Sequence, residues 1–195
     1  MLTKQIKISK EKILQAAFDI TREKGIEYVS NREIARRLSS SIRPIYYQFK
    51  NSEELMSELY VKIEKYFYQY ITSNLTSDMT KYKQTGINYI KFAKNEKYFF
   101  KALFMSKTTL DNESFIKKDY EDYKVINEFI KESTKLDEKD IISFHNLMWL
   151  YTHGIACLIA TETLTISDEE ISKLLTEEYK ALMLLNERKK DEKNN

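Results

Sequence analysis

Apolar residues recur at intervals of three and four positions along most of the chain, and this spacing places them on one face of an α-helix. Ile13, Leu14, Ala17 and Phe18 show the pattern first, directly after Ser9, whose side chain can cap the helix. Further long helices are predicted near residues 51–75, 79–95, 97–107, 112–134, 137–164 and 167–188. The pattern therefore predicts an all-α protein.

Two shorter helices are predicted between the first helix and the long helix that starts near residue 51. Ser30 and Glu33 have the spacing of a capping box, in which each side chain accepts a hydrogen bond from a free backbone N–H. The helix that they open ends near Leu38. Three serines, residues 39–41, separate it from a second short helix that ends near Phe49. Two short helices joined by a tight turn are typical of a helix-turn-helix.

The two short helices each combine apolar and polar positions. Ala35 is small enough to let the helices cross closely. The residues expected to point inward are Ile34, Leu38, Ile45 and Phe49. The residues expected on the outer face of the second helix are Arg43, Pro44, Tyr47 and Gln48. A helix with such a face suits the major groove of DNA, which is wide enough to admit it.

The distribution of charge supports contact between the N-terminal part and a polyanion. Residues 1–50 contain 11 Lys and Arg against 5 Asp and Glu, a net charge of +6, whereas residues 51–195 have a net charge of −4. Arg32, Arg36, Arg37 and Arg43 lie inside the patterned region rather than in a terminal tail. At least one of Arg36 and Arg37 is expected on a solvated helix face. A basic segment of this kind is common in proteins that bind nucleic acids.

The composition leaves little material for catalysis. The 195 residues include 3 glycines, 1 proline, 1 cysteine and 2 histidines. The scarcity of glycine and proline disfavours β-rich folds, which need frequent tight turns. The single cysteine, Cys157, excludes an internal disulfide and a multi-cysteine metal site. Because the sequence has no nucleophile–base pair, no metal-ligand spacing and no glycine-rich phosphate loop, we predict neither an enzyme nor a cofactor.

Residues Ser9–Leu59 resemble the DNA-binding domain of the TetR/AcrR family of transcriptional regulators. The resemblance implies that the second and third helices read DNA, and that a divergent helical C-terminal domain dimerises and often binds a small effector. We accordingly expect a helix-turn-helix domain at residues 1–52 and an effector-binding and dimerisation domain at residues 53–195. The matching segments, in the family's order and spacing, are Ile13–Ala17, Glu23–Gly25, Arg32–Ala35, Ile45–Phe49 and Lys50–Leu55.

The resemblance also implies roles for particular side chains. Arg32 resembles the residue that reaches a base from the second helix. Tyr46 and Tyr47 resemble an aromatic pair that touches phosphates and bases, although Tyr46 could instead pack in the core. Ser39 and Ser40 stand in a turn that usually contains glycine. The residues predicted to contact DNA are Arg32, Ser41, Ile42, Arg43, Pro44, Tyr46, Tyr47, Gln48, Lys50 and Ser52.

The C-terminal domain is rich in aromatic residues, most of which are expected in the core. An aromatic-lined cavity among them would suit a small apolar or cationic effector. The residues predicted to contact this ligand are Phe67, Tyr89, Phe92, Phe104, Tyr123, Met148, Trp149 and His153.

The helices near 137–164 and 167–188 suit a four-helix bundle formed with a second copy of the chain. Gly154 lies inside the first of them, where glycine costs about 1 kcal/mol relative to alanine, and the close approach of a partner helix would explain its presence. Both helices could instead pack only on their own domain. The polar tail after Glu187 is expected to fray.

The stretch Ile141–Thr161 lacks charged residues and has the length of a membrane span. It contains Ser143, His145 and Asn146, which a lipid-facing helix would expose at a cost in free energy. A helix buried among other helices is the better interpretation. Since no targeting signal is visible either, we expect a cytoplasmic protein without a membrane partner.

The resemblance to the TetR/AcrR family implies a ligand-responsive, homodimeric transcriptional repressor that binds a palindromic DNA operator. An effector bound in the C-terminal domain would tilt the fourth helix and move the two reading helices of the dimer apart. A helical adaptor, or a regulator controlled by a protein partner rather than a small molecule, is the alternative. An all-helical enzyme is the third possibility and has the least support.

Overall fold

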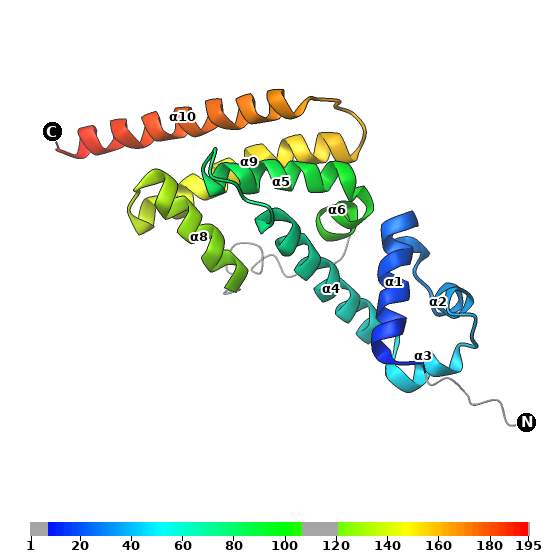
Figure 1. Cartoon of the computed structure of the whole chain (residues 1–195). Coiled ribbons are helices and arrows are strands. Elements are labelled where there is room, and N and C mark those ends of the chain that lie inside the picture. The colour runs from blue at the N-terminus through cyan, green and yellow to red at the C-terminus, as the bar shows by residue number, and fades with distance from the viewer. Residues whose placement is uncertain (1–7, 107–120, 195) are drawn as a thin grey trace, which may run out of the picture. The chain divides into compact units, whose positions relative to one another are not determined.

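The computed structural model describes residues 8–106 and 121–194, and these residues form helices and turns without a β-strand (Figure 1). The all-α prediction is confirmed. The helices are α1 (Lys10–Lys24), η1 (Ile26–Tyr28), α2 (Asn31–Arg37), α3 (Arg43–Gln48), α4 (Ser52–Thr72), α5 (Lys81–Asn95), α6 (Lys97–Phe104), α8 (Glu121–Thr134), α9 (Glu138–Ala160) and α10 (Asp168–Asn194).

Several helices begin at the caps that the sequence predicts. The Ser9 hydroxyl accepts a hydrogen bond from the N–H of Lys12, and the Ser30 hydroxyl accepts one from the N–H of Glu33. At the start of α10 the capping box is complete, because the Ser167 hydroxyl accepts from the N–H of Glu170 and the Glu170 carboxylate accepts from the N–H of Ser167. These side chains satisfy backbone donors that a helix leaves unpaired at its N-terminus.

Two predicted helices differ from those in the structure. The helix expected at 112–134 is described from Glu121 onward, and residues 112–120 lie outside the described part of the chain. The expectation that the chain frays after Glu187 is wrong, because α10 continues to Asn194. The residues after Glu187 are mostly lysine, arginine and glutamate, which have high helix propensity.

The chain divides into two compact units, which we call the N-terminal unit (residues 1–67 and 96–106) and the C-terminal unit (residues 68–95 and 107–195). Helix α4 contributes to both units, and α6 belongs to the N-terminal unit together with the helix-turn-helix. The domain limits 1–52 and 53–195 stay a prediction, since compactness does not establish which segments act as functional domains.

In the N-terminal unit, α1 packs against the short helices α2 and α3 and also against α4 and α6. Its fully buried side chains include Ile13, Ile20, Ile34, Leu59 and Phe99. The carboxylate of Glu96, which is only 6% exposed, accepts hydrogen bonds from Arg22 Nε of α1 at 2.9 Å and from the Tyr66 hydroxyl of α4 at 2.8 Å. A buried charge paired in this way holds α1, α4 and the start of α6 in one arrangement.

The C-terminal unit is built around α5 and α9, which lie side by side (Figure 1). The Tyr82 hydroxyl is 3.0 Å from Nδ1 of His145, and the Tyr89 hydroxyl is 2.9 Å from Nδ1 of His153. Because both pairs advance in the same direction along the two helices, α5 and α9 are parallel. Helix α10 covers them with Ile171, Leu175 and Leu182, which are buried. None of the helices in the described residues is long and apolar enough to cross a membrane.

Candidate nucleic-acid interface

The turn between α2 and α3 depends on a serine in a left-handed conformation. Ser39 has φ of 48°, a region that residues other than glycine rarely adopt. The N–H of Ser40 donates to the carbonyl of Ala35 at 2.9 Å, and the N–H of Ser39 donates to the carbonyl of Arg36 at 3.1 Å. These two bonds form a Schellman motif, which ends α2 and turns the chain toward α3. Ser39 therefore occupies the position where glycine would be least strained.

Helix α3 buries one side and exposes the other. Ile45 and Phe49 are 2% and 3% exposed, and Pro44 lies in the first turn, where the N–H that it lacks would have no partner. Tyr46 is 60% exposed and Tyr47 is 83% exposed. The alternative that Tyr46 packs in the core is therefore wrong. The exposed side of α3 presents two aromatic rings to the solvent.

The cations of the helix-turn-helix fall into two groups. Arg36 and Arg37 are paired with carboxylates of the protein. Arg36 donates from Nε and Nη2 to the Glu33 carboxylate, and Arg37 donates to the Glu23 carboxylate. For Arg32, Arg43 and Lys50 the structure shows no ion pair with another residue of its described part. The charges of Arg36 and Arg37 are thus neutralised by carboxylates of the same chain, whereas Arg32, Arg43 and Lys50 are available to phosphates or bases.

The paired carboxylates are held in their charged form. The hydrogen bond from Arg36 is the main cause that lowers the pKa of Glu33 to about 2, and Lys24 contributes further. The pKa of Glu23 is likewise lowered, mainly by the hydrogen bond from Arg37. Because both carboxylates stay ionised at neutral pH, they continue to neutralise Arg36 and Arg37. The expectation that one of these arginines lies on a solvated face fits Arg36, which is exposed.

The start of α4 places Lys50 and Ser52, both exposed, beside the turn that follows α3. The Asn51 side chain caps α4 by accepting from the N–H of Glu54 at 2.8 Å. In return, the Glu54 carboxylate accepts from the N–H of Lys50 at 2.6 Å. The Lys50 N–H is thus already bonded to a carboxylate, and any phosphate contact of Lys50 would come from its side chain.

The remaining predicted contacts have different surroundings. Ser41 and Ile42 are exposed in the turn. Gln48 is half-buried, and its Nε2 donates to the carbonyl of Ile8 at 3.3 Å. Tyr28, which the sequence prediction left out, is 56% exposed at the end of η1 and precedes the cap of α2. The exposure of its side chain is the only feature that makes Tyr28 a candidate for DNA contact. From the sequence, an aromatic residue next to an apolar one is more readily assigned to the core.

The structure brings together only some of the residues predicted to bind a ligand. In the C-terminal unit, the Trp149 ring stacks on the His153 ring at a centroid distance of 4.9 Å, and His153 is bonded to Tyr89. Phe92 contacts Tyr70, and Met148 is buried. Phe67 and Phe104 contact each other in the N-terminal unit. The side chain of Tyr123 lies outside the described part of the structure.

The cluster of Tyr89, Trp149, His153 and Cys157 is neutral. The Cys157 Sγ lies 3.3 Å from Nε2 of His153, so both ring nitrogens of the histidine have a partner. Burial raises the pKa of Tyr89 and of Cys157, and it lowers the pKa of His153. Each group therefore keeps its uncharged form near neutral pH. The cluster offers aromatic faces and uncharged polar groups.

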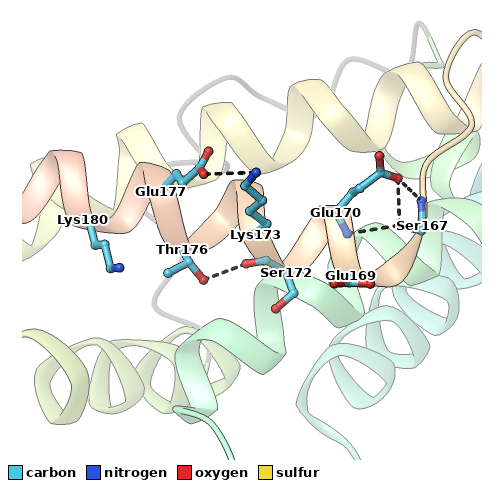
Figure 2. A pocket seen from close by; sticks show the side chains of 8 residues that line it. All are labelled: Ser167, Glu169, Glu170, Ser172, Lys173, Thr176, Glu177 and Lys180. Atoms are coloured by element: carbon cyan, nitrogen blue, oxygen red, sulfur yellow. Dashed lines mark hydrogen bonds and ion pairs between the residues drawn. The ribbon is translucent and has the colours of Figure 1, made fainter.

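Two hollows of the C-terminal unit contain none of the predicted ligand residues. Figure 2 shows the first, which is lined from Ser167 to Lys180 by the exposed side of α10 and its cap alone. The second lies beside Asn74 and Asp168. There, Lys91 pairs with Asp168 at 2.8 Å, and the Gln84 amide bonds to the backbone of Thr76 and Met79. Both hollows are polar, and neither has the apolar lining that an organic effector needs.

Comparison with known proteins agrees with this geometry. The sequence profile of bacterial regulatory proteins of the tetR family matches residues 13–59, which span α1 to the first part of α4. Residues 13–59 are therefore similar to the bacterial regulatory proteins of the tetR family. The matched segment contains the turn at Ser39, the exposed side of α3 and the unpaired cations. No curated protein matches the chain in sequence.

Two solved structures have the tetR-family fold over most of this chain. A TetR family protein from Vibrio parahaemolyticus matches with a TM-score of 0.61 and 16% identity, over 88% of this chain and 96% of its own. A TetR-like transcriptional regulator from Rhodococcus sp. RHA1 matches with a TM-score of 0.58 and 14% identity, over 92% of this chain and 96% of its own. At these identities the likeness shows a shared fold.

Proposed function

We propose that this tetR-family protein is a ligand-responsive transcriptional repressor that binds a palindromic operator as a homodimer. The observation that carries the DNA-binding part is the exposed side of α3, with Tyr46 and Tyr47 beside the unpaired cation Arg43. Arg32 on α2 and Lys50, two residues before α4, are further exposed cations. Phosphate contacts by such cations give affinity, and base contacts from a helix in the major groove give sequence preference.

An exposed apolar stripe on α9 supports the dimer. Leu147, Leu150 and Leu158 are exposed, and they lie with Gly154 at the three- and four-residue spacing of one helix face. A side chain built at Gly154 would meet no other atom within 4 Å. Exposed leucines that line one side of a helix are typical of an interface, and a glycine among them lets a second helix approach closely.

Helix α10 contributes a similar surface. Leu184 and Leu185 are 59% and 42% exposed near its C-terminal end. Two helices with exposed apolar residues can form a four-helix bundle when a second copy packs against them about a two-fold axis. A two-fold dimer would present two copies of α3 to the two halves of a palindrome.

The cluster around His153 supports an effector site in the C-terminal unit. Trp149, His153 and Tyr89 pack ring against ring, and aromatic rings attract cations and also pack on apolar groups. His153 does not oppose a cationic ligand, because burial keeps its pKa below the ordinary value and the ring uncharged. A small apolar or cationic effector is therefore the class that we propose.

The test is binding of the purified protein to labelled DNA from its own upstream region, titrated against salt beside a random duplex. We expect both affinities to fall steeply with salt and the native duplex to bind at least ~10³-fold more tightly. Binding that does not depend on salt, or no binding at low salt, would contradict the proposal and favour a helical adaptor.

A further inference from the structure

The exposed side of α3 contains a single arginine. Arg43 is four residues from Tyr47, so the two side chains lie one turn apart on the side opposite to the buried Ile45. Since Tyr47 is 83% exposed, this side is the one that a DNA groove would meet first. Arg43 is also exposed.

The other polar side chains of α3 offer less to a base edge. The Gln48 amide nitrogen is engaged by the carbonyl of Ile8, and Gln48 is half-buried. Tyr46 and Tyr47 have one hydroxyl each on a broad ring. Ile42, just before the helix, and Pro44 are apolar. Arg43 is therefore the one side chain of α3 that can make two parallel hydrogen bonds from an uncommitted planar group.

The base edge that matches the donors of Arg43 is that of guanine. Guanine presents two acceptors in the major groove, O6 and N7, and the arginine fork bonds both. Adenine requires a donor and an acceptor together, which an arginine cannot supply. Isoleucine and aromatic rings instead pack on the methyl group of thymine. Resting on the proposed function, we infer that α3 reads one G·C pair in each operator half-site, that Arg43 is the residue that reads it, and that the neighbouring pairs are read mainly through thymine methyl groups.

A phosphate contact by Arg43 would leave a different signature. A base-reading arginine sets the preference at one position, whereas a phosphate-binding cation raises affinity for all sequences and steepens the salt dependence. Lys50 provides the comparison, because it is an exposed, unpaired cation outside α3. Substitution of Arg43 should therefore change the base preference at one position, whereas substitution of Lys50 should change the overall affinity and its salt dependence.

The experiment is selection of bound duplexes from a random pool with the full chain, followed by affinity measurements on the enriched site. The wild type should enrich a motif with one strongly preferred G·C pair per half-site within the α3 footprint. Changing that pair should lower affinity roughly 5- to 100-fold. Arg43→Ala should lose the preference there and keep it elsewhere, because alanine has no donor for O6 or N7 of guanine.

Lys50→Ala is the matched control and should weaken binding to all duplexes alike. Circular dichroism of each variant checks that it is folded, which we expect because Arg43 contacts no other charged group in the described residues. If Arg43→Ala enriches the same motif and only flattens the salt dependence, the inference is wrong while the proposed function stands. If the wild type enriches no motif, the proposed function is wrong as well.

Discussion

At the scale of single residues, Ser39 adopts a conformation that its side chain disfavours. A left-handed conformation costs a residue with a Cβ about 1–2 kcal/mol. The Schellman bonds of Ser39 and Ser40 hold it there, and they fix the direction in which α3 leaves α2. The position is thus a strained point in the segment on which the proposed DNA contacts depend.

Ser39→Gly should stabilise the protein by about 0.5–1 kcal/mol, because relief of the backbone strain exceeds the extra entropy of glycine in the unfolded chain. The midpoint of urea unfolding would move upward. Ser40→Gly is the matched control: Ser40 has no positive φ, so the same change should lower the midpoint. Equal shifts for both variants would show that Ser39 is not strained.

His145 predicts a dependence of stability on pH. Burial lowers its pKa from 6.5 to about 4, so the folded protein holds it neutral. The unfolded chain binds the proton more readily, and folding stability therefore falls as the pH drops from about 6.5 toward 4. Between pH 7 and 5 the loss is about 2 kcal/mol.

His145→Gln should remove that part of the pH dependence, since glutamine does not titrate. The free energy of unfolding, measured at pH 7 and pH 5, should fall by about 2 kcal/mol less in the variant than in the wild type. The carboxylates titrate equally in both proteins and cancel from the comparison. An identical loss in the two proteins would mean that His145 is accessible to protons in the folded state.

At the scale of helices, α9 has two functions that its sequence combines. One side carries the buried Phe144 and Ala156 toward α5 and α10, and the other exposes Leu147, Leu150 and Leu158. Because one side of α9 is buried and the other exposes leucines, the stretch from Ile141 to Thr161 is apolar nearly all round. None of the described helices, α9 included, is long and apolar enough to span a membrane.

Leu150→Glu should convert the proposed dimer to a monomer, because it places a charge in the centre of the exposed stripe. Sedimentation at micromolar concentration measures this directly. Val61→Glu is the control, as Val61 is exposed on α4 in the N-terminal unit and should leave the dimer intact. A wild-type protein that sediments as a monomer would contradict the interface.

The sequence predicted most of the helices and their caps, because apolar spacing and capping side chains act over three or four residues. It also predicted that Ile45 and Phe49 are buried. It could not decide between core and surface for Tyr46, since an aromatic residue at the border of a helix face suits both. The pairing of Arg37 with Glu23 joins residues far apart in sequence, so no local pattern revealed which arginines remain available.

At the scale of the whole molecule, the charge asymmetry between the two ends of the sequence gains a structural meaning. Much of the positive charge of α1 and α2 is neutralised by partners such as Glu58, Glu23 and Glu33. In the described part of the helix-turn-helix, the cations without an ion pair are therefore a smaller set than the cations of its sequence. If the proposed function is right, these few cations rather than the total charge determine the affinity for DNA.

The most direct test compares the salt-dependent DNA affinity of the wild type with that of a variant carrying Arg32→Ala, Arg43→Ala and Lys50→Ala. A control variant with Lys94→Ala, Lys124→Ala and Lys180→Ala removes the same charge from the C-terminal unit. We predict that the first variant loses at least roughly 100-fold in affinity and has a shallower salt dependence, while the control stays within roughly 10-fold of the wild type. Equal losses in the two variants would contradict the account, because net charge alone would then explain binding.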